Sequence, residues 1–406
     1  MNSLEFLTKK ISVVFEGNFP EGYCNDVQYW GNTSREGLHT TLPDGTMKMT
    51  CMDLDVGNAC SFKCPHCFRR DDRFDVVDGC NKLTHEEIVG YIREAKELGL
   101  KQIKVLGRGE PFQNPRFLEF LEEVSAMGIG VAVFTKGHVI GSDAHAKKYN
   151  GHRGITTGQK LADRLHELNV SILLGFHSFN KETQEEFAGI DLLSINSPLK
   201  DYVGMRDQAL LNLVKAGFNK YVEGEATRLA IIPAPVKPEN IQEIFNLYTW
   251  ARKRNIYCVS SPTMISGKGI DELMREENFK SYISELTEIW TQIYIWAIET
   301  NLIPLEKFVE DGVSMYPGAH PCNQTAAGFY LNLSGQVNMC PGRVDSETIF
   351  SEDIRKDGLK ATWMNSANYQ RAQGNGFNYH CPARDGHSVP VNFYDDIQAK
   401  VLEALA

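Results

Sequence analysis

Between residues 51 and 260, short apolar runs that predict strands alternate with longer segments that have the apolar periodicity of helices. This alternation implies parallel strands joined by right-handed crossovers. By itself it allows either an open doubly wound sheet or a barrel. We predict strands at Met52–Val56, Gln102–Leu106, Gly130–Phe134, Ser171–Gly175, Thr227–Ile232 and Tyr257–Ser260, and helices at Thr84–Leu98, Arg116–Met127, Gly158–Leu168, Pro198–Ala216 and Glu239–Arg254.

The segments on either side of this core differ from it in composition. Residues 1–50 are rich in glycine, asparagine and aromatic residues, and we expect short strands or a cover over one end of the core. Residues 274–303 predict one long helix with an apolar stripe. We therefore divide the chain into an N-terminal extension (1–50), a main α/β domain with its connecting helix (51–303) and a small irregular α+β domain (304–406).

Charge and hydropathy exclude several classes of partner. The net charge of −10 provides no basic face for a nucleic acid. No uncharged apolar run reaches membrane-spanning length, and the first residues lack the apolar core of a signal peptide. Ten cysteines in 406 residues do not resemble a secreted disulfide scaffold. We therefore expect reduced thiols, no membrane partner and a cytoplasmic location.

Three cysteines, Cys60, Cys64 and Cys67, lie within eight residues directly after the first predicted strand. Three thiols this close cannot all pair as disulfides, but they can all face one object from a single loop. Soft thiolates select zinc, copper or iron–sulfur clusters. We interpret the loop as three ligands of a cluster with one open iron; a zinc site that also uses His66, or three unrelated buried thiols, are the alternatives.

The Cys-x3-Cys-x2-Cys stretch resembles the signature of the radical S-adenosylmethionine (SAM) enzymes. The resemblance implies a partial (β/α)6 TIM-like barrel with the cysteine loop at its C-terminal mouth. It implies that the three thiolates hold three irons of a 4Fe–4S cluster and that SAM chelates the fourth. One electron, from a donor such as a flavodoxin or ferredoxin, would cleave SAM to a 5′-deoxyadenosyl radical, which abstracts a hydrogen atom from the substrate.

Further segments resemble the SAM-binding motifs of that family. Gly107-Arg-Gly-Glu-Pro follows the second strand and resembles Gly-Gly-Glu-Pro, so Gly109 and Glu110 are expected to grip the SAM amino group. Thr135-Lys-Gly after the third strand resembles Thr-Asn-Gly and is expected to touch SAM. His66 and Phe68 flank the third cysteine and are expected at the cofactor.

The fourth and fifth strands carry additional candidates. Relatives often show Ser-x-Asp-Ser-x-Asp at the end of the fourth strand and use the first Ser or the Asp on SAM. This chain has Gly175 and His177 at those places, and Ser178 is carried over as the SAM-binding candidate. Arg228 would neutralise the SAM carboxylate if its side chain points inward. For a general base, which removes the substrate proton in an oxidation, the candidates by location are His177, Glu225, the neighbouring Glu223, and Tyr330.

The C-terminal segment contains three widely spaced cysteines, Cys322, Cys340 and Cys381. The spacing Cys-x12-Gly-x4-Cys resembles the opening of the auxiliary-cluster domain named SPASM, and the low number of cysteines resembles its shortened form, twitch. The resemblance implies an auxiliary 4Fe–4S cluster, which makes two clusters in all. A zinc knuckle or three unpaired structural thiols are the alternatives.

The fourth ligand of that cluster is left open by the sequence. Twitch domains often end in Cys-x2-Cys, and here the second place is Arg384. Asp385, His387, Cys258 and the substrate itself are the candidates.

We expect a radical SAM enzyme that oxidises or otherwise modifies a small polar metabolite. Modification of a ribosomal precursor peptide by crosslinking, oxidation or epimerisation is the second hypothesis. A non-catalytic zinc-binding interaction protein is the hypothesis from another class, and the Gly-Arg-Gly-Glu-Pro turn counts against it because zinc binding does not require such a turn.

Overall fold

The computed structural model describes residues 3–30, 40–68, 82–106, 108–269, 279–319, 322–374 and 380–406. Gly107 and the first residues of the helix predicted at 274–303 lie outside the described residues. The chain is organised around a nine-stranded sheet with the order β6-β5-β4-β3-β2-β1-β7-β8-β9. The strands are β1 (Cys51–Leu54), β2 (Gln102–Val105), β3 (Gly130–Thr135), β4 (Val170–Gly175), β5 (Leu229–Ile232), β6 (Tyr257–Cys258), β7 (Gly328–Leu331), β8 (Val337–Asn338) and β9 (Ile349–Ser351).

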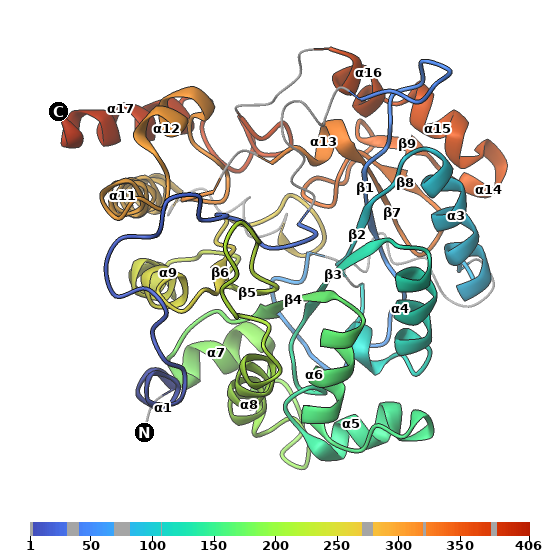
Figure 1. The fold of residues 1–406 in the computed structure, drawn as a ribbon, viewed down its shortest axis with the longest axis horizontal. Coiled ribbons are helices and arrows are strands. Elements are labelled where there is room, and N and C mark those ends of the chain that lie inside the picture. The colour runs from blue at the N-terminus through green and yellow to red at the C-terminus, as the bar shows by residue number, and fades with distance from the viewer. Residues whose placement is uncertain are drawn as a thin grey trace.

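All six predicted strands are present, and consecutive strands from β1 to β6 pair in parallel (Figure 1). Strand β7 pairs in parallel with the other edge of β1, and β8 and β9 continue the sheet in antiparallel fashion. This order confirms the predicted α/β class, a partial (β/α)6 barrel extended by a C-terminal region.

Helices cover the outer face of the sheet (Figure 1). The predicted helices are present, and two short ones that the periodicity did not predict, α5 and α7, lie between them. No described helix is long and apolar enough to cross a bilayer. The helices are α1 (Ser3–Lys10), α3 (His85–Glu97), α4 (Phe117–Ala126), α5 (Asp143–Asn150), α6 (Gly158–Glu167), α7 (Lys181–Ala188), α8 (Tyr202–Lys215), α9 (Ile244–Arg252), α11 (Phe279–Glu299), α12 (Leu305–Asp311), α13 (Gln324–Ala327), α14 (Ile354–Asp357), α15 (Leu359–Asn365), α16 (Ala367–Gln373) and α17 (Phe393–Leu405).

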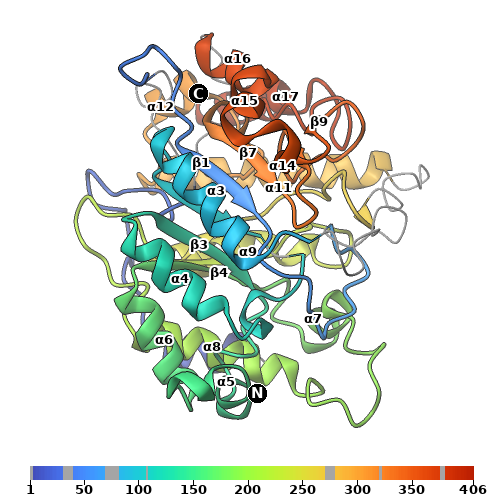
Figure 2. The ribbon, with the colours of Figure 1, turned by 90° about the vertical axis from the view of Figure 1, so that its right-hand side faces the viewer.

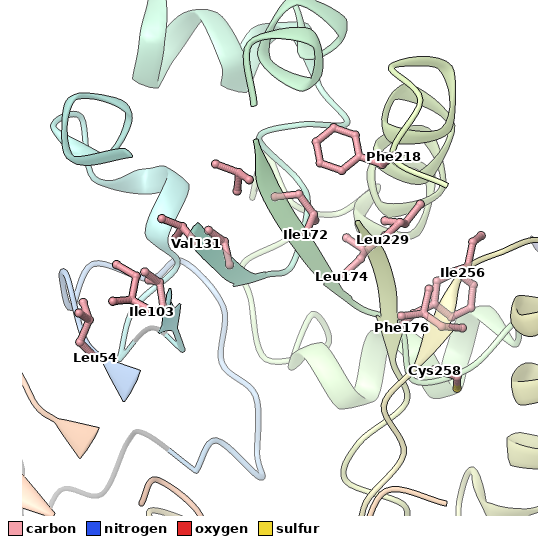
Figure 3. Close-up of a cluster of buried hydrophobic side chains, with 14 of the residues drawn as sticks. Leu54, Ile103, Val131, Ile172, Leu174, Phe176, Phe218, Leu229, Ile256 and Cys258 are labelled. Atoms are coloured by element: carbon pink, nitrogen blue, oxygen red, sulfur yellow. The ribbon is translucent and has the colours of Figure 1, made fainter. Parts of the chain in front are cut away.

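Alternation along the strands separates two apolar layers. Val131, Ile172 and Leu229 belong to the large cluster between sheet and helices and lie on the same side of the strands in Figure 3. Ala132 and Leu173, one position further along, belong to a second cluster on the inner face of the barrel. Both faces of these strands are therefore buried, as is usual for parallel sheets.

The N-terminal region begins with a helix rather than the short strands that we expected. Helix α1 has only about two turns, too few for its apolar periodicity to stand out in the sequence. Among the described residues before β1, only single β-bridges occur, such as Val27 to Thr227. The Phe15 N–H donates to the Lys253 carbonyl, and Trp30 joins the inner cluster, so this region covers one end of the barrel.

The C-terminal region shares the sheet with the barrel, and its helices gather beside β7 (Figure 2). Trp363 of α15 is fully buried and donates its indole N–H to the Met47 carbonyl at 2.9 Å, just before β1. At the start of β7, a Cβ atom on Gly328 would lie 1.6 Å from the Cys51 carbonyl oxygen. Only glycine therefore allows β7 to approach β1 at this point.

The substitution Gly328→Ala is expected to destabilise the protein by about 2–3 kcal/mol, because the added methyl group forces β7 away from β1. Chemical denaturation followed by circular dichroism measures the change. Gly90→Ala in α3 is the matched control: its Cβ meets nothing within 4 Å, and alanine favours a helix interior by roughly 0.5–1 kcal/mol. Equal stability of the two variants would contradict the role of the β1–β7 contact.

Candidate active site

The cysteine loop and the glycine-rich turn follow adjacent strands and pack directly on each other. The Gly109 N–H donates to the Gly57 carbonyl at 3.1 Å, and the Glu110 N–H donates to the Ala59 carbonyl at 2.8 Å. A Cβ atom on Gly109 would lie 2.3 Å from the Ala59 carbonyl oxygen. Glycine is therefore required for the two backbones to meet beside Cys60.

Glu110 is held at the carboxyl end of the sheet by residues of the next strand. Its side chain is buried, and its carboxylate accepts hydrogen bonds from the Thr135 hydroxyl at 2.5 Å and the Lys136 N–H at 2.8 Å. Burial raises the pKa of Glu110, while these hydrogen bonds act in the opposite direction. The structure thus brings the predicted residues Glu110 and Thr135 together, and a fixed carboxylate suits an ammonium ligand.

Lys136 faces the thiols of the cysteine loop. Burial lowers the pKa of Lys136, but the thiolates of Cys64, Cys60 and Cys67 raise it, and the net shift is upward. Its ammonium lies 3.0 Å from Nε2 of His177. A cation at this position favours the thiolate form that metal binding needs. Sequence reasoning noted Lys136 only as a departure from asparagine and missed this role.

The imidazole rings of His66 and His177 are buried and lie close together. Their ring centroids lie 5.3 Å apart, and both rings pack on Phe187. Burial holds the pKa of both imidazoles well below the usual value, and Lys136 acts in the same direction. His177 is therefore a neutral imidazole, as a general base must be before it accepts a proton.

A second network fixes the start of the cysteine loop. Gln113 accepts a hydrogen bond from the Ser61 N–H at 3.1 Å and directs its amide nitrogen at Nε2 of His138, 2.9 Å away. Because the amide nitrogen is a donor, Nε2 of His138 must carry a lone pair. Burial lowers the pKa of His138 to about 3, which keeps the imidazole neutral.

The two sets of three cysteines offer thiol ligands alone, which is the ligand type of iron–sulfur clusters. Among the described residues, His85, Glu119 and Glu123 form a separate group whose ligand atoms all lie within 4.8 Å of one another.

Cys322, Cys340 and Cys381 converge on one cavity of about 120 Å³, which His66 and Phe68 of the cysteine loop also line. Burial raises the pKa of Cys340 to about 12 and that of Cys381 to about 11, and the neighbouring thiolates add to both shifts. A metal centre bound at the three thiols would favour their deprotonated form and so offset these upward pKa shifts.

None of the protein candidates for a fourth ligand lines this cavity. Asp385 pairs with His380 at 3.4 Å, and His387 lies 3.0 Å from the Arg343 guanidinium. Cys258 belongs to the cluster between sheet and helices, on the outer side of β6 (Figure 3). Arg384, at the place of the missing cysteine, does line the cavity.

Two predicted residues lie away from the site. Arg228 precedes β5 at the amino end of the sheet, where its guanidinium donates to the Val170 and His166 carbonyls. It cannot neutralise a ligand at the opposite end, so that prediction was wrong. Glu225 and Glu223 are exposed in the loop before β5 and are likewise excluded as catalytic bases. The sequence shows that these residues lie next to a strand, but it does not show that they lie at the end of the sheet opposite the cysteine loop.

Two other predicted site residues, Ser178 and Tyr330, are buried, and their hydroxyl groups already form hydrogen bonds. The Ser178 hydroxyl donates to the Glu243 carboxylate at 2.8 Å, and it accepts from the Asn180 N–H. The Tyr330 hydroxyl donates to the Asp55 carboxylate at 2.6 Å. Neither residue lines the cavity.

Sequence reasoning also missed an ion pair inside the barrel, between Lys104 of β2 and Asp53 of β1. Both residues line the cavity. The signal was present in the sequence, because Lys104 is the one charged residue of its predicted strand and Asp53 and Asp55 share one face of theirs.

The family model of the radical SAM superfamily matches residues 54–279, more than half of the chain. The chain belongs to the radical SAM superfamily. It is an enzyme, and its cofactors are SAM and a 4Fe–4S cluster. Cys60, Cys64 and Cys67 are the soft ligands that fit the cluster, and Glu110 fits the SAM ammonium group.

The chain is 27% identical to a probable GTP 3′,8-cyclase of Thermococcus kodakarensis, over 42% of the chain and 50% of the relative. It is 26% identical to the GTP 3′,8-cyclase of Sulfurimonas denitrificans, over 50% of the chain and 52% of the relative. The chain thus spans about half the length of these curated relatives.

Two solved structures are also similar in part. Streptococcus suis SuiB bound to S-adenosylmethionine has a TM-score of 0.48 and 14% identity, with 81% of this chain and 69% of that chain covered. HydG, a maturase of the [FeFe]-hydrogenase, has a TM-score of 0.39 and 10% identity, with 88% and 78% covered.

Gly109→Ala is expected to weaken SAM binding by about tenfold or more, because the methyl group separates the glycine-rich turn from the cysteine loop. Equilibrium dialysis of anaerobically reconstituted protein with labelled SAM measures the affinity. Gly57→Ala is the matched control in the same contact, since its Cβ would lie an ordinary 3.5 Å from Asn114. Wild-type affinity in the Gly109 variant would refute the requirement for close approach.

Acidification is expected to destabilise the protein through His138. Its pKa is about 3 in the fold and about 6.5 in the unfolded chain, so between these values the unfolded state binds more protons. The stabilisation is complete above pH 6.5 and is lost as the pH falls.

The free energy of unfolding should therefore drop between pH 7.5 and 5.5 by about 1.4 kcal/mol more in the wild type than in His138→Asn. Urea titrations at both values measure this difference. His152→Asn, at an exposed histidine, should behave as the wild type. An identical pH dependence in all three proteins would show that His138 does not titrate as described.

Proposed function

We propose that this enzyme abstracts a hydrogen atom from a small polar metabolite bound between two thiol sites. The observation that carries the proposal is the single cavity whose wall contains His66 and Phe68 beside one site and Cys322, Cys340 and Cys381 of the other. The cavity has a volume of about 120 Å³ and is bordered by both thiol sites, so a compact metabolite held there would lie between them.

When both groups are bound, the reduced cluster would supply one electron that cleaves SAM to methionine and a 5′-deoxyadenosyl radical. The chain's own residues hold the reactants and exclude water. Glu110 would fix the SAM ammonium group, and Lys136 would face the thiolate ligands. Apolar and aromatic side chains make up most of the cavity wall, which protects a reactive centre from solvent. We infer a flavodoxin or ferredoxin as the electron donor.

Cys322, Cys340 and Cys381 would hold an auxiliary 4Fe–4S cluster of the twitch type. Because Arg384 replaces a fourth thiolate, this cluster would keep one open corner toward the cavity. It would then serve as an electron acceptor in an oxidation or as an anchor for the substrate. A purine nucleotide is the second substrate candidate, because the similar GTP 3′,8-cyclases are named for one, and it would require the cavity to widen.

Anaerobically reconstituted wild-type protein is expected to contain about eight irons, and Cys340→Ala about four, with SAM cleavage retained and substrate turnover lost. Iron analysis and chromatography of 5′-deoxyadenosine measure the two effects. Cys258→Ala is the control, because Cys258 lies outside the cavity, and it should keep about eight irons. An iron content of about four in the wild type would reject the auxiliary cluster, and zinc without iron would reject the proposed function.

A further inference from the structure

The inner face of the barrel carries one buried ion pair. The parallel register of β1 and β2 places Asp53 directly opposite Lys104, and the Lys104 Nζ lies 3.1 Å from Oδ1 of Asp53. The Asp53 side chain is 1% exposed and the Lys104 side chain is 7% exposed. Removing two charges from water is costly, and apolar residues of similar size are often at least as stabilising. Stability alone therefore gives little reason for a pair at this position.

The placement of Lys104 indicates a binding role. It lines the cavity, and its ammonium lies 5.0 Å from the centre of the Trp30 ring. An ammonium group has three N–H donors. Among the described residues, the Asp53 carboxylate is the one anionic partner within ion-pair distance of Lys104. A nine-tenths buried cation with donors to spare thus faces the space where the substrate would lie.

Arg384 adds a second cation to the same wall. It is 2% exposed, and its hydrogen bonds go to the Pro262 carbonyl and the Met315 sulfur, neither of which carries a charge. Tyr316 lines this wall as well, so the two cations and one tyrosine belong to the wall of a single cavity.

We propose that Lys104 and Arg384 form a subsite for a carboxylate group, so that the substrate is a compact organic monocarboxylate. The inference rests on the proposed function, because it takes this cavity as the substrate site. Asp53 offsets the charge of Lys104, whereas the hydrogen-bond partners of Arg384 carry no charge, so a carboxylate would offset the second cation. Charged hydrogen bonds at a buried site also discriminate strongly against a neutral ligand.

Benzoate, benzamide and inorganic phosphate are suitable probes, because the first two have nearly the same shape and differ in charge. Isothermal titration calorimetry on the full chain, reconstituted and loaded with SAM, measures their affinities. Benzoate should bind about tenfold or more tightly than benzamide. Equal affinity of the two, tighter binding of phosphate, or no benzoate binding up to millimolar concentrations would overturn the proposal.

Variants separate binding from folding. Lys104→Met alone leaves the Asp53 carboxylate buried without its cation, which is expected to destabilise the fold. The double variant Asp53→Asn/Lys104→Met removes both charges, and it should fold, hold the wild-type iron content and show a weaker preference for benzoate, because only Arg384 of the two cations remains. Lys101→Met, an exposed position just before β2, is the control and should keep that preference.

An undiminished preference for benzoate in the double variant would reject the subsite. SAM cleavage by the wild-type preparation tests the proposed function separately. Cleavage without a preference for benzoate would reject only the carboxylate subsite, whereas absence of cleavage would reject the proposed function itself.

Discussion

The parallel pairing of β1 on both of its edges is the interaction on which the rest of the site depends. On one edge, β2 brings the glycine-rich turn onto the backbone of the cysteine loop, where only Gly109 fits. On the other edge, β7 joins the C-terminal region to the barrel, and the three cysteines of that region line a cavity that His66 and Phe68 of the cysteine loop also line. Strand β1 itself contributes Asp53 and leads directly into Cys60. Four residues of strand thus connect both thiol sites to one cavity.

Much of this arrangement could be predicted from local sequence patterns. Six apolar runs predicted six strands, and the capping box at Thr84 and Glu87 is present at the start of α3 with both of its hydrogen bonds. The spacing of Cys60, Cys64 and Cys67 identified the cluster loop because close thiols of this pattern have few other uses. These features depend on neighbouring residues, whose relation the sequence shows directly.

The remaining features depend on contacts between distant parts of the chain. Arg228 was assigned to a strand, but its effect depends on which end of the strand it occupies, and the structure places it at the amino end. Lys104 meets Asp53 only because two strands pair in one register, and Arg384 reaches the cavity only because the C-terminal region folds back onto β1. A charged residue at an inward position of a buried strand is a signal that can be sought in advance.

The account rests on the claim that the loop of Cys60, Cys64 and Cys67 binds a cluster at which SAM is cleaved. Assay of 5′-deoxyadenosine after addition of dithionite to reconstituted protein and SAM tests this claim most directly. The account predicts that the nucleoside forms in the wild type and is absent when the three cysteines are replaced by alanine. Iron bound at the loop without any cleavage of SAM, or cleavage that persists without the three thiols, would contradict it.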